Sequence, residues 1–201
     1  MHSFRSPARL ATLLIAALCY PHLHAAAEEY TIDPAHTFAT FEIRHLGIST
    51  QRGRFNSTRG KVALDAEAGI GNINVVIDAQ SIDTGNEAME KLLRGKDFFN
   101  VEQFPQIVYK AQRVVFTNGQ PERIDGELTL LGITKPVSLT VSAYSCTRKP
   151  FLVQLRCGMD ANSELKRSDF GMDTYLSFAS DEVKLAIQAE AVVPPKPQSP
   201  E

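Results

Sequence analysis

Hydrophobic and polar residues alternate with a period of two along most of this chain. Such alternation is typical of β-strands that bury one face and expose the other to water. The successive strands predict an all-β fold, an antiparallel up-and-down barrel of about eight strands, with a β-sandwich as the alternative. The clearest segments are 39–45, 72–81, 124–130, 137–143 and 183–191, and less regular strands are expected over 52–66, 106–117 and 152–163.

Turn signals separate these strands. Glycine supports backbone conformations that other residues avoid, and proline cannot continue a strand ladder. We expect turns at Ala68-Gly69, Asn118-Gly119 and 132–136. In the strand that follows the third turn, alternate residues share the apolar face, namely Val137, Leu139, Val141 and Ala143.

One segment breaks the strand pattern with a helical period. Over Glu87 to Arg94, the residues Met89, Leu92 and Leu93 form an apolar stripe, and Phe98-Phe99 follows shortly after. An apolar insertion between barrel strands is expected to cover one mouth of the barrel. We therefore predict a short helical insertion that acts as a lid or plug.

A barrel with an apolar interior either encloses a ligand or is filled by its own side chains, and sequence leaves both possibilities open. If the interior is hollow, the inward strand positions and the insertion would line a ligand site. The predicted lining residues are Phe41, Ile43, His45, Ile77, Met89, Leu92, Leu93, Phe98, Phe99, Leu128, Leu139, Phe170 and Leu185.

The two ends of the chain differ in composition from the strands. Residues 1–27 have two arginines, an apolar run from Leu10 to Cys19 and the small residues 25–27, a pattern that predicts a cleaved signal peptide. A lipoprotein with Cys19 as its anchor is the alternative, but the residues around Cys19 are a poor context for lipidation. We expect a barrel domain over 28–193, a proline-rich frayed tail over 194–201, and a periplasmic location.

Charge excludes some partners. Two of the 21 basic residues and none of the 23 acidic ones lie in the leader, so residues 28–201 carry a formal charge of −4. A mildly acidic protein with scattered charges is a poor candidate for binding nucleic acid or anionic lipid surfaces.

Cleavage would leave two cysteines, Cys146 and Cys157. An isolated pair in an oxidising compartment is expected to form a disulfide. Strict alternation places the two side chains on different sides of their strands, so a bulge or an irregular turn must bring them together. Their spacing fits neither a C-x-x-C redox motif nor a zinc site.

An ordered set of short motifs extends over nearly all of residues 30–190. The set resembles the YceI-like family of polyisoprenoid-binding periplasmic proteins. This resemblance implies a lipocalin-like barrel whose long apolar interior takes an isoprenoid or similar lipid chain. The motifs are Asp33-Pro-Ala-His36, His45-Leu-Gly, Gly53-Arg-Phe55, Ser81-Ile-Asp-Thr-Gly85, Asp97-Phe-Phe99, Phe104-Pro105, Gly126-x-Leu-Thr-Leu-x-Gly-x-Thr-Lys-Pro136, Arg167-Ser-Asp-Phe-Gly-Met172 and Asp181-x-Val183.

The insertion departs from the family pattern. Many relatives carry Arg-Asp-x-His-Leu there, whereas this chain has Met89-Glu-Lys-Leu-Leu93. The arginine and histidine are replaced by apolar residues. The resemblance therefore implies binding of the chain, while binding of a polar head group is either weaker than in those relatives or uses other residues.

Few residues suggest catalysis or metal binding. His45 shares the inward face with Phe41, so it either meets a ligand's polar end or bonds to its own neighbours. His36 precedes the strand, where a role in a turn is expected, and nothing in the sequence brings the histidines to metal-ligand spacing. There is no G-x-S-x-G motif, and each serine near an acidic residue, such as Ser168 before Asp169, lies in a turn-like context.

These patterns predict a binding protein without cofactor or metal rather than an enzyme. The expected ligand is a long isoprenoid-type lipid, such as a polyprenyl phosphate or a quinone-like molecule. The alternatives are an enzyme that acts on a lipid in the same cavity and a structural barrel with a filled interior. A transient contact with a membrane protein and a homodimer both stay open, while nucleic acid is not an expected partner.

Overall fold

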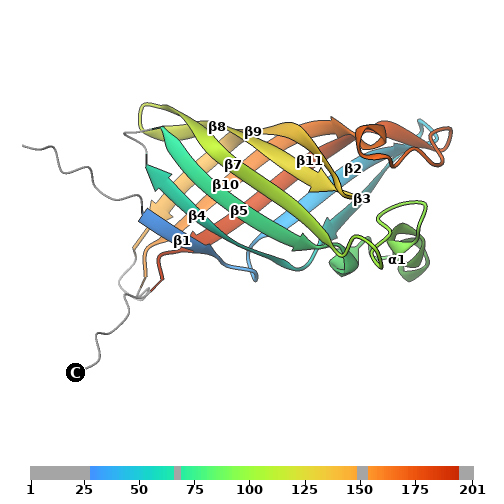
Figure 1. The fold of residues 1–201 in the computed structure, drawn as a ribbon, viewed down its shortest axis with the longest axis horizontal. Helices are drawn as coiled ribbons and strands as arrows, with labels where there is room; N and C mark the ends of the chain where they lie inside the picture. Colours follow the sequence, from blue (N-terminus) through green and yellow to red (C-terminus); the bar gives the residue numbers. More distant parts are fainter. Residues whose placement is uncertain (1–27, 66–68, 149–153, 195–201) are drawn as a thin grey trace, which may run out of the picture.

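The protein is a closed antiparallel β-barrel with one short helix at one end (Figure 1). A computed structural model describes residues 28–65, 69–148 and 154–194. The strands are β1 (Glu28–Ile32), β2 (Phe38–His45), β3 (Ser49–Phe55), β4 (Thr58–Asp65), β5 (Ile70–Asp78), β6 (Ile82–Asp83), β7 (Gln106–Thr117), β8 (Gln120–Leu130), β9 (Ile133–Thr147), β10 (Arg156–Lys166) and β11 (Ala179–Val192). The helices are the 3-10 turns η1 (Ala79–Ser81) and η2 (Arg167–Phe170) and the α-helix α1 (Glu87–Arg94).

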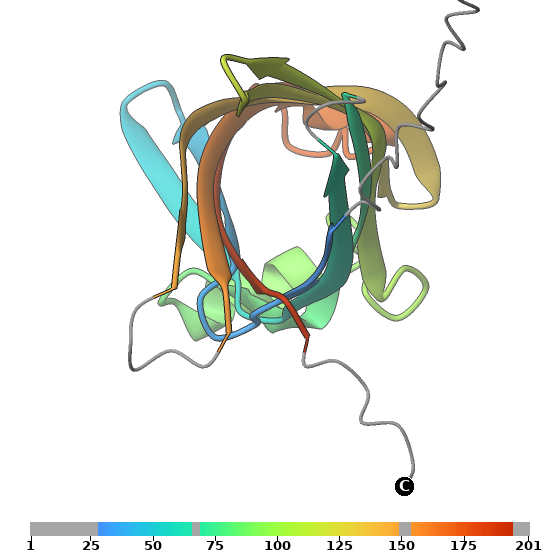
Figure 2. The same ribbon diagram turned by 90° about the vertical axis from the view of Figure 1, so that its left-hand side faces the viewer.

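The strands occupy eight positions around the barrel. β1 and β2 both pair with β11 and share one position, and β3 and β4 share the next, because β3 pairs with β2 while β4 pairs with β1. The short β6 continues β5 and pairs with β3. Pairing then runs from β5 through β7, β8, β9 and β10 to β11, which closes the ring seen end-on in Figure 2.

Three neighbouring strand positions each consist of two strands separated by a short break, namely β1 and β2, β3 and β4, and β5 and β6. Between β1 and β2, the Asp33 carboxylate accepts a hydrogen bond from the Ala35 amide, a turn that Asx residues favour. Between β3 and β4, the Asn56 amide donates to the Ser81 carbonyl at 3.0 Å, and the Ser57 amide donates to the Ser81 hydroxyl oxygen at 3.0 Å. These bonds keep the backbone groups paired where the regular ladder stops.

The barrel wall is apolar inside and polar outside. Inward positions of β5, β8 and β11 carry Ile, Val and Leu, and the most buried of them form one hydrophobic core cluster. Exposed outward positions include Lys61, Lys110, Glu127 and Lys184. Within the described ranges, no helix has both the length and the apolar character needed to cross a membrane.

The predicted fold class is confirmed, with differences in detail. The helix expected over Glu87 to Arg94 has those bounds, and the strand expected over 106–117 is β7. The strand expected over 72–81 ends at Asp78, since the Asp78 carboxylate caps the 3-10 turn η1. The turn expected over 132–136 is confined to 131–132, so Pro136 lies inside β9 opposite Glu127. The short β1 was not predicted.

A bulge in β9 brings the two cysteines together. Asp160 of β10 pairs with Ala143, but the next residue, Ala161, pairs with Val141, so one residue of β9 is left over. The bulge reverses the alternation of inward and outward side chains beyond it. Ala143 was predicted to share the apolar face with Val141, and this prediction is wrong because Ala143 is exposed. Beyond the bulge, Cys146 lies directly opposite Cys157, and their sulfur atoms are bonded. The predicted disulfide is confirmed.

A charged cluster joins the beginning of β10 to the seam of the barrel, which is the pairing of β1 with β11 that closes the ring. The Arg156 guanidinium donates to Asp33 and, at 2.9 Å, to Glu190 of β11. The hydrogen bond from Arg156, together with one from His36, lowers the pKa of Asp33 to about 2. Because the Asp33 side chain is 16% exposed, this ion pair is less screened than an ordinary surface pair.

Removal of the disulfide is expected to destabilise the barrel. Closing a loop of this length constrains the unfolded chain, so Cys146→Ser/Cys157→Ser should lose about 3 kcal/mol of unfolding free energy. Urea denaturation of the double variant and of the reduced wild-type protein measures this loss. The two should agree, and a reduced wild type as stable as the oxidised protein would contradict the prediction.

The Asp33 ion pair is expected to make stability sensitive to acid. The folded-state pKa of Asp33 is depressed from 3.8 to about 2. Its contribution is therefore present above pH ~4 and is lost as the pH falls through ~2. At pH 7, Asp33→Asn should cost about 1–2 kcal/mol, and this difference from wild type should shrink toward zero near pH 2. Denaturant titrations of both proteins at several pH values measure it, and a difference that stays constant with pH would count against the ion pair.

Candidate ligand cavity

A cavity of about 560 Å³ runs inside the barrel. This volume lies within the range of sites that hold small molecules or lipids. Its wall is formed almost entirely by apolar side chains that alternate inward from the strands, with the α1 segment and the 171–178 loop at one end. The barrel is therefore hollow, and the alternative of an interior filled by side chains is not what the structure shows.

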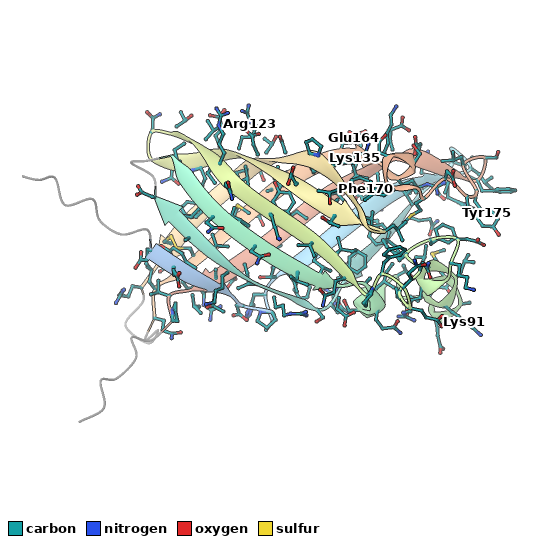
Figure 3. The ribbon with its side chains drawn as sticks, in the orientation of Figure 1. Lys91, Arg123, Lys135, Glu164, Phe170 and Tyr175 are labelled. Carbon is teal, nitrogen blue, oxygen red and sulfur yellow. A yellow bond between two sulfur atoms is a disulfide. The ribbon has the colours of Figure 1, made fainter. Side chains whose placement is uncertain are left out.

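Twelve of the thirteen predicted lining residues border this cavity. They are Phe41, Ile43, His45, Ile77, Met89, Leu92, Leu93, Phe98, Phe99, Leu128, Leu139 and Leu185. Phe170 is the exception. It is the last residue of η2 and packs into the hydrophobic core cluster, where it is 2% exposed. It borders a shallow depression beside Lys135 and Glu164, the region labelled in Figure 3, instead of the interior.

The few polar groups of the cavity wall mostly have partners in the protein. The buried Tyr109 hydroxyl donates to the Val137 carbonyl at 2.9 Å, and burial raises the pKa of this phenol. The Thr37 hydroxyl donates to the Glu190 carbonyl and accepts from the Glu190 amide, each at 3.1 Å. Satisfied groups of this kind cost little in an apolar wall.

Arg167 is the most buried charged residue of the wall, at 2% exposure. Its guanidinium donates to the carbonyls of Met172, Thr174, Ala179 and Ser180 at 2.8 to 3.1 Å. Burial lowers the pKa of this guanidinium. These four bonds hold the 171–178 loop against β11, so the side chain has a structural role at the edge of the cavity.

The α1 segment lies beside the end of the barrel that is to the right in Figure 1. The Asn86 side chain caps the helix by accepting from the Met89 amide. At the other end of the helix, the Arg94 guanidinium donates to the carbonyls of Gln80 and Ile82, at 3.0 and 2.9 Å. No residue of the helix is fully buried, so α1 is attached mainly through its last turn.

The adjacent phenylalanines after α1 contact different parts of the molecule. Phe99 packs against Phe55 inside the barrel, with ring centres 5.3 Å apart and edge-to-face geometry. Phe98 stacks on Tyr175 of the 171–178 loop, with ring centres 5.8 Å apart. The pair therefore ties the lid both to the barrel interior and to the opposite loop, through aromatic contacts that contribute about 0.5–1.5 kcal/mol each beyond burial.

Exposed apolar side chains gather around this same end. In the described part of the chain, the large hydrophobic residues classed as exposed belong to α1, to the 171–178 loop, to the turn between β2 and β3, or to the start of β9. Figure 3 shows Tyr175 and Lys91 at this end and the yellow disulfide bond at the other. The exposed set is Leu46, Ile48, Leu92, Ile133, Tyr175, Leu176 and Phe178. We call these seven residues the exposed collar. Because exposed apolar patches mark interaction sites, we assign the mouth of the cavity to this end of the barrel.

His45 lines the cavity but offers no catalytic pair. It lies opposite Ser49 across β2 and β3, and no hydrogen bond joins their side chains. Among the described residues the His45 imidazole has no hydrogen-bond partner at all, so it is not a histidine satisfied by its neighbours. It remains available to a polar group at the mouth.

One cluster has metal-ligand spacing that sequence did not reveal. Ligand atoms of Asp33, His36 and Glu190 lie within 4.8 Å of one another. The His36 ring bonds to Asp33 at 3.0 Å, in the turn role expected for it. The Arg156 guanidinium already binds both carboxylates. Its positive charge would repel a metal ion at the same place, so we assign no metal to the cluster.

Some lining residues were missed by sequence reasoning. Ile107, Tyr109, Phe55 and Thr58 border the cavity from strands whose alternation is less regular. The alternation of Ile107 and Tyr109 could have revealed those two positions. Tyr175, in contrast, lies in a loop without a periodic pattern, and Arg167 holds that loop beside the cavity.

Comparisons with known proteins agree with this geometry. The profile of the YceI-like domain matches residues 30–191. A UPF0312 protein of Yersinia pestis is 38% identical over 183 residues, which is 90% of this chain and 94% of the relative. A UPF0312 protein of Yersinia enterocolitica is 37% identical over the same shares.

Solved structures share the fold at low sequence identity. The structure of Burkholderia cenocepacia BcnA has a TM-score of 0.65 and 22% identity, and the match covers 79% of this chain and 98% of BcnA. A polyisoprenoid binding domain from Saccharophagus degradans has a TM-score of 0.62 and 16% identity, with 85% of this chain and all of that domain covered. Since the family profile and these relatives extend over nearly all of the barrel, the chain belongs to the YceI-like family.

Proposed function

We propose that this protein binds one isoprenoid-type lipid chain inside the barrel and sequesters or carries it in the periplasm. The continuous apolar cavity of about 560 Å³ is the observation that carries the proposal. A solved structure of the same fold is described as a polyisoprenoid binding domain, which supports the class of ligand. The predicted signal peptide, which lies outside the described residues, supports the location.

Burial of apolar surface alone is sufficient to hold such a chain. Each buried methylene contributes about 0.8 kcal/mol, so several isoprene units would bind without a single hydrogen bond. Branched methyl groups fit a wall of Ile, Leu and Val side chains such as Ile43, Ile77 and Leu185. We therefore expect the chain to determine affinity, with a polyprenyl phosphate and a quinone-like molecule as the two candidate kinds of ligand.

The chain would enter through the mouth beneath α1. The helix is anchored by Arg94, while its apolar residues Met89 and Leu93 face the cavity. Aromatic contacts of Phe98 and Phe99 hold the rest of the lid, and such contacts can break and re-form without covalent change. The exposed collar would shield the chain from water during transfer.

Binding fits the site better than catalysis. The cavity wall in the described residues contains no nucleophile hydrogen-bonded to a base, and its charged residues are engaged in structural contacts. Acyl or phosphoryl transfer on a bound lipid would require such a pair. The enzyme alternative therefore has no observation in its favour.

Organic extraction tests the proposal directly. Protein purified from the periplasm, without detergent, is extracted and the extract is analysed by mass spectrometry. We expect a polyprenyl or similarly long apolar lipid in the extract. The intact mass of the same sample should correspond to a chain that begins near Glu28.

Two results would contradict the proposal. One is an extract free of lipid from a protein that also takes up no long-chain isoprenoid in vitro. The other is loss of turnover of an ester, pyrophosphate or quinone substrate in His45→Ala while lipid binding persists, which would make the protein an enzyme.

Filling the cavity should block uptake. Leu128 is 8% exposed and lines the cavity, whereas the adjacent Glu127 points outward from the same strand. Leu128→Trp should reduce isoprenoid binding at least about tenfold while the barrel still folds, at a cost of about 1–3 kcal/mol for overpacking. The matched variant Glu127→Trp should bind like wild type. Ligand titration and circular dichroism of both variants measure this, and unchanged binding in Leu128→Trp would show that the chain lies elsewhere.

A further inference from the structure

The exposed collar continues into the cavity. Its most exposed member is Ile48, at 79%, in the turn between β2 and β3. Leu92, Tyr175 and Phe178 belong to the collar and also border the cavity, so apolar surface extends from the outside of the barrel into its interior. Single apolar residues on a surface need no explanation, whereas a group of them around the mouth of a cavity indicates an interaction site.

Two collar residues have a backbone conformation that is unfavourable for their type. Leu46 has a φ of 51° and Tyr175 a φ of 60°, in the left-handed region where glycine and asparagine are favoured. The turn between β7 and β8 has an asparagine, Asn118, at the corresponding φ of 52°. A leucine that is both strained and half exposed adds little to the stability of the fold. Its presence indicates that the side chain is used in an interaction.

The backbone of the collar is already hydrogen-bonded within the protein. The Leu46 amide donates to the Phe178 carbonyl at 2.7 Å, which also ties the turn to the 171–178 loop. The Ile48 amide donates to the His45 carbonyl at 3.0 Å. In the hydrocarbon of a bilayer, backbone groups find no partner and must be satisfied internally. The tip of the collar meets this requirement, so it is suited to contact with lipid.

The collar has no excess of positive charge that would attract anionic head groups. In the β2–β3 hairpin, the Arg44 guanidinium bonds within the turn, and Arg52 pairs with Glu42 at 2.7 Å. The charged residue of the 171–178 loop is Asp173. Burial of apolar side chains therefore has to supply the attraction to a membrane, which agrees with the mildly acidic balance of the chain.

We propose that the exposed collar docks on a phospholipid bilayer, with Leu46, Ile48 and Phe178 inserted at the level where head groups meet acyl chains. The inference goes beyond the proposed function, because it concerns the surface that the barrel contacts and not the molecule inside it. In the docked state, the mouth faces the acyl chains. A lipid chain can then pass between bilayer and cavity without crossing water.

Flotation with vesicles measures docking. The purified protein is mixed with vesicles of phosphatidylcholine and phosphatidylethanolamine and separated on a density gradient. Wild type should float with them, and added phosphatidylglycerol or salt should change the bound fraction less than about twofold. Ile48→Asp should lower the partition coefficient about tenfold or more, because a charge replaces an inserted apolar side chain. Gln120→Asp adds the same charge beside the β7–β8 turn, at the left in Figure 1, and should bind like wild type.

A second set of variants separates docking from folding. Asparagine tolerates the left-handed conformation better than leucine, so Leu46→Asn should have a denaturation midpoint at or above that of wild type. Its vesicle binding should nevertheless fall about threefold or more, since apolar surface is lost. The chain contains no tryptophan, so Ile48→Trp reports on its own surroundings. Its fluorescence should shift to the blue when vesicles are added, and that of Gln120→Trp should not.

Three results would overturn the docking proposal. The first is wild-type protein that floats with none of these vesicles. The second is binding that requires phosphatidylglycerol and is abolished by salt, since attraction between charges would then replace apolar insertion. The third is a wild-type dimer in analytical ultracentrifugation that Ile48→Asp converts to a monomer without any binding to vesicles, since the collar would then join two copies of this chain. Uptake of isoprenoids by wild type would leave the proposed function intact in each case, whereas a barrel that floats but takes up no isoprenoid would contradict only that function.

Discussion

Closure of the barrel between β1 and β11 is the constraint on which the rest of the structure depends. β1 is only five residues long, and it meets β11 at the pairs Thr31–Val192 and Ile32–Ala191. Without this seam, β1 and the end of β11 would have open edges with unpaired backbone groups, and the barrel would be closed only through β2, β3 and the two-residue β6. The residues that reinforce it come from different parts of the chain. Asp33 and Thr37 lie between β1 and β2, and Arg156 begins β10. Thr37 and Arg156 both bond to Glu190 of β11, and Arg156 also bonds to Asp33.

The closed ladder explains how the interior can stay hollow. In a compact core, side-chain packing and strand pairing support each other, and an unfilled volume forfeits dispersion contacts. Here the ladder hydrogen bonds lie within the wall and close on themselves, and the disulfide adds a covalent link between β9 and β10. The shape of the cavity thus depends mainly on the wall, and any ligand that fills it would add stability through linkage.

The residues of the recognisable motifs are mostly part of this wall. Ser81 and Asp83 bond to the break between β3 and β4, the first through the Ser57 amide and the second through the Asn56 side chain. Asp181 accepts from both the amide and the hydroxyl of Ser168. Such motifs indicate the fold with high specificity. Several of their residues, such as His45, Phe99 and Leu128, also line the cavity, but a wall of mostly apolar side chains says little about which lipid fills it.

Periodicity predicted the wall well because it follows directly from strand geometry. The alternation of Val183, Leu185 and Ile187 is visible in the sequence and is the inward face of β11. What it could not predict depends on tertiary contacts. The bulge near Val141, the break after Asp78 and the position of Phe170 each follow from a particular pairing or cap. The buried Thr58 hydroxyl, which lacks a hydrogen-bond partner in the described residues, is also invisible in sequence, since a buried threonine is equally suited to bond the backbone.

The two ends of the barrel are held by different kinds of interaction, and this difference bears on how a chain could enter. At the end with the disulfide, a covalent bond and the Arg156 ion pairs hold β9, β10, β11 and the segment after β1. At the other end, α1 depends on the hydrogen bonds of Arg94 and on ring contacts of Phe98 and Phe99. Local opening occurs where few buried contacts must be broken. The lid end can therefore open while the seam and the ladder remain intact, which separates loading of the cavity from unfolding of the barrel.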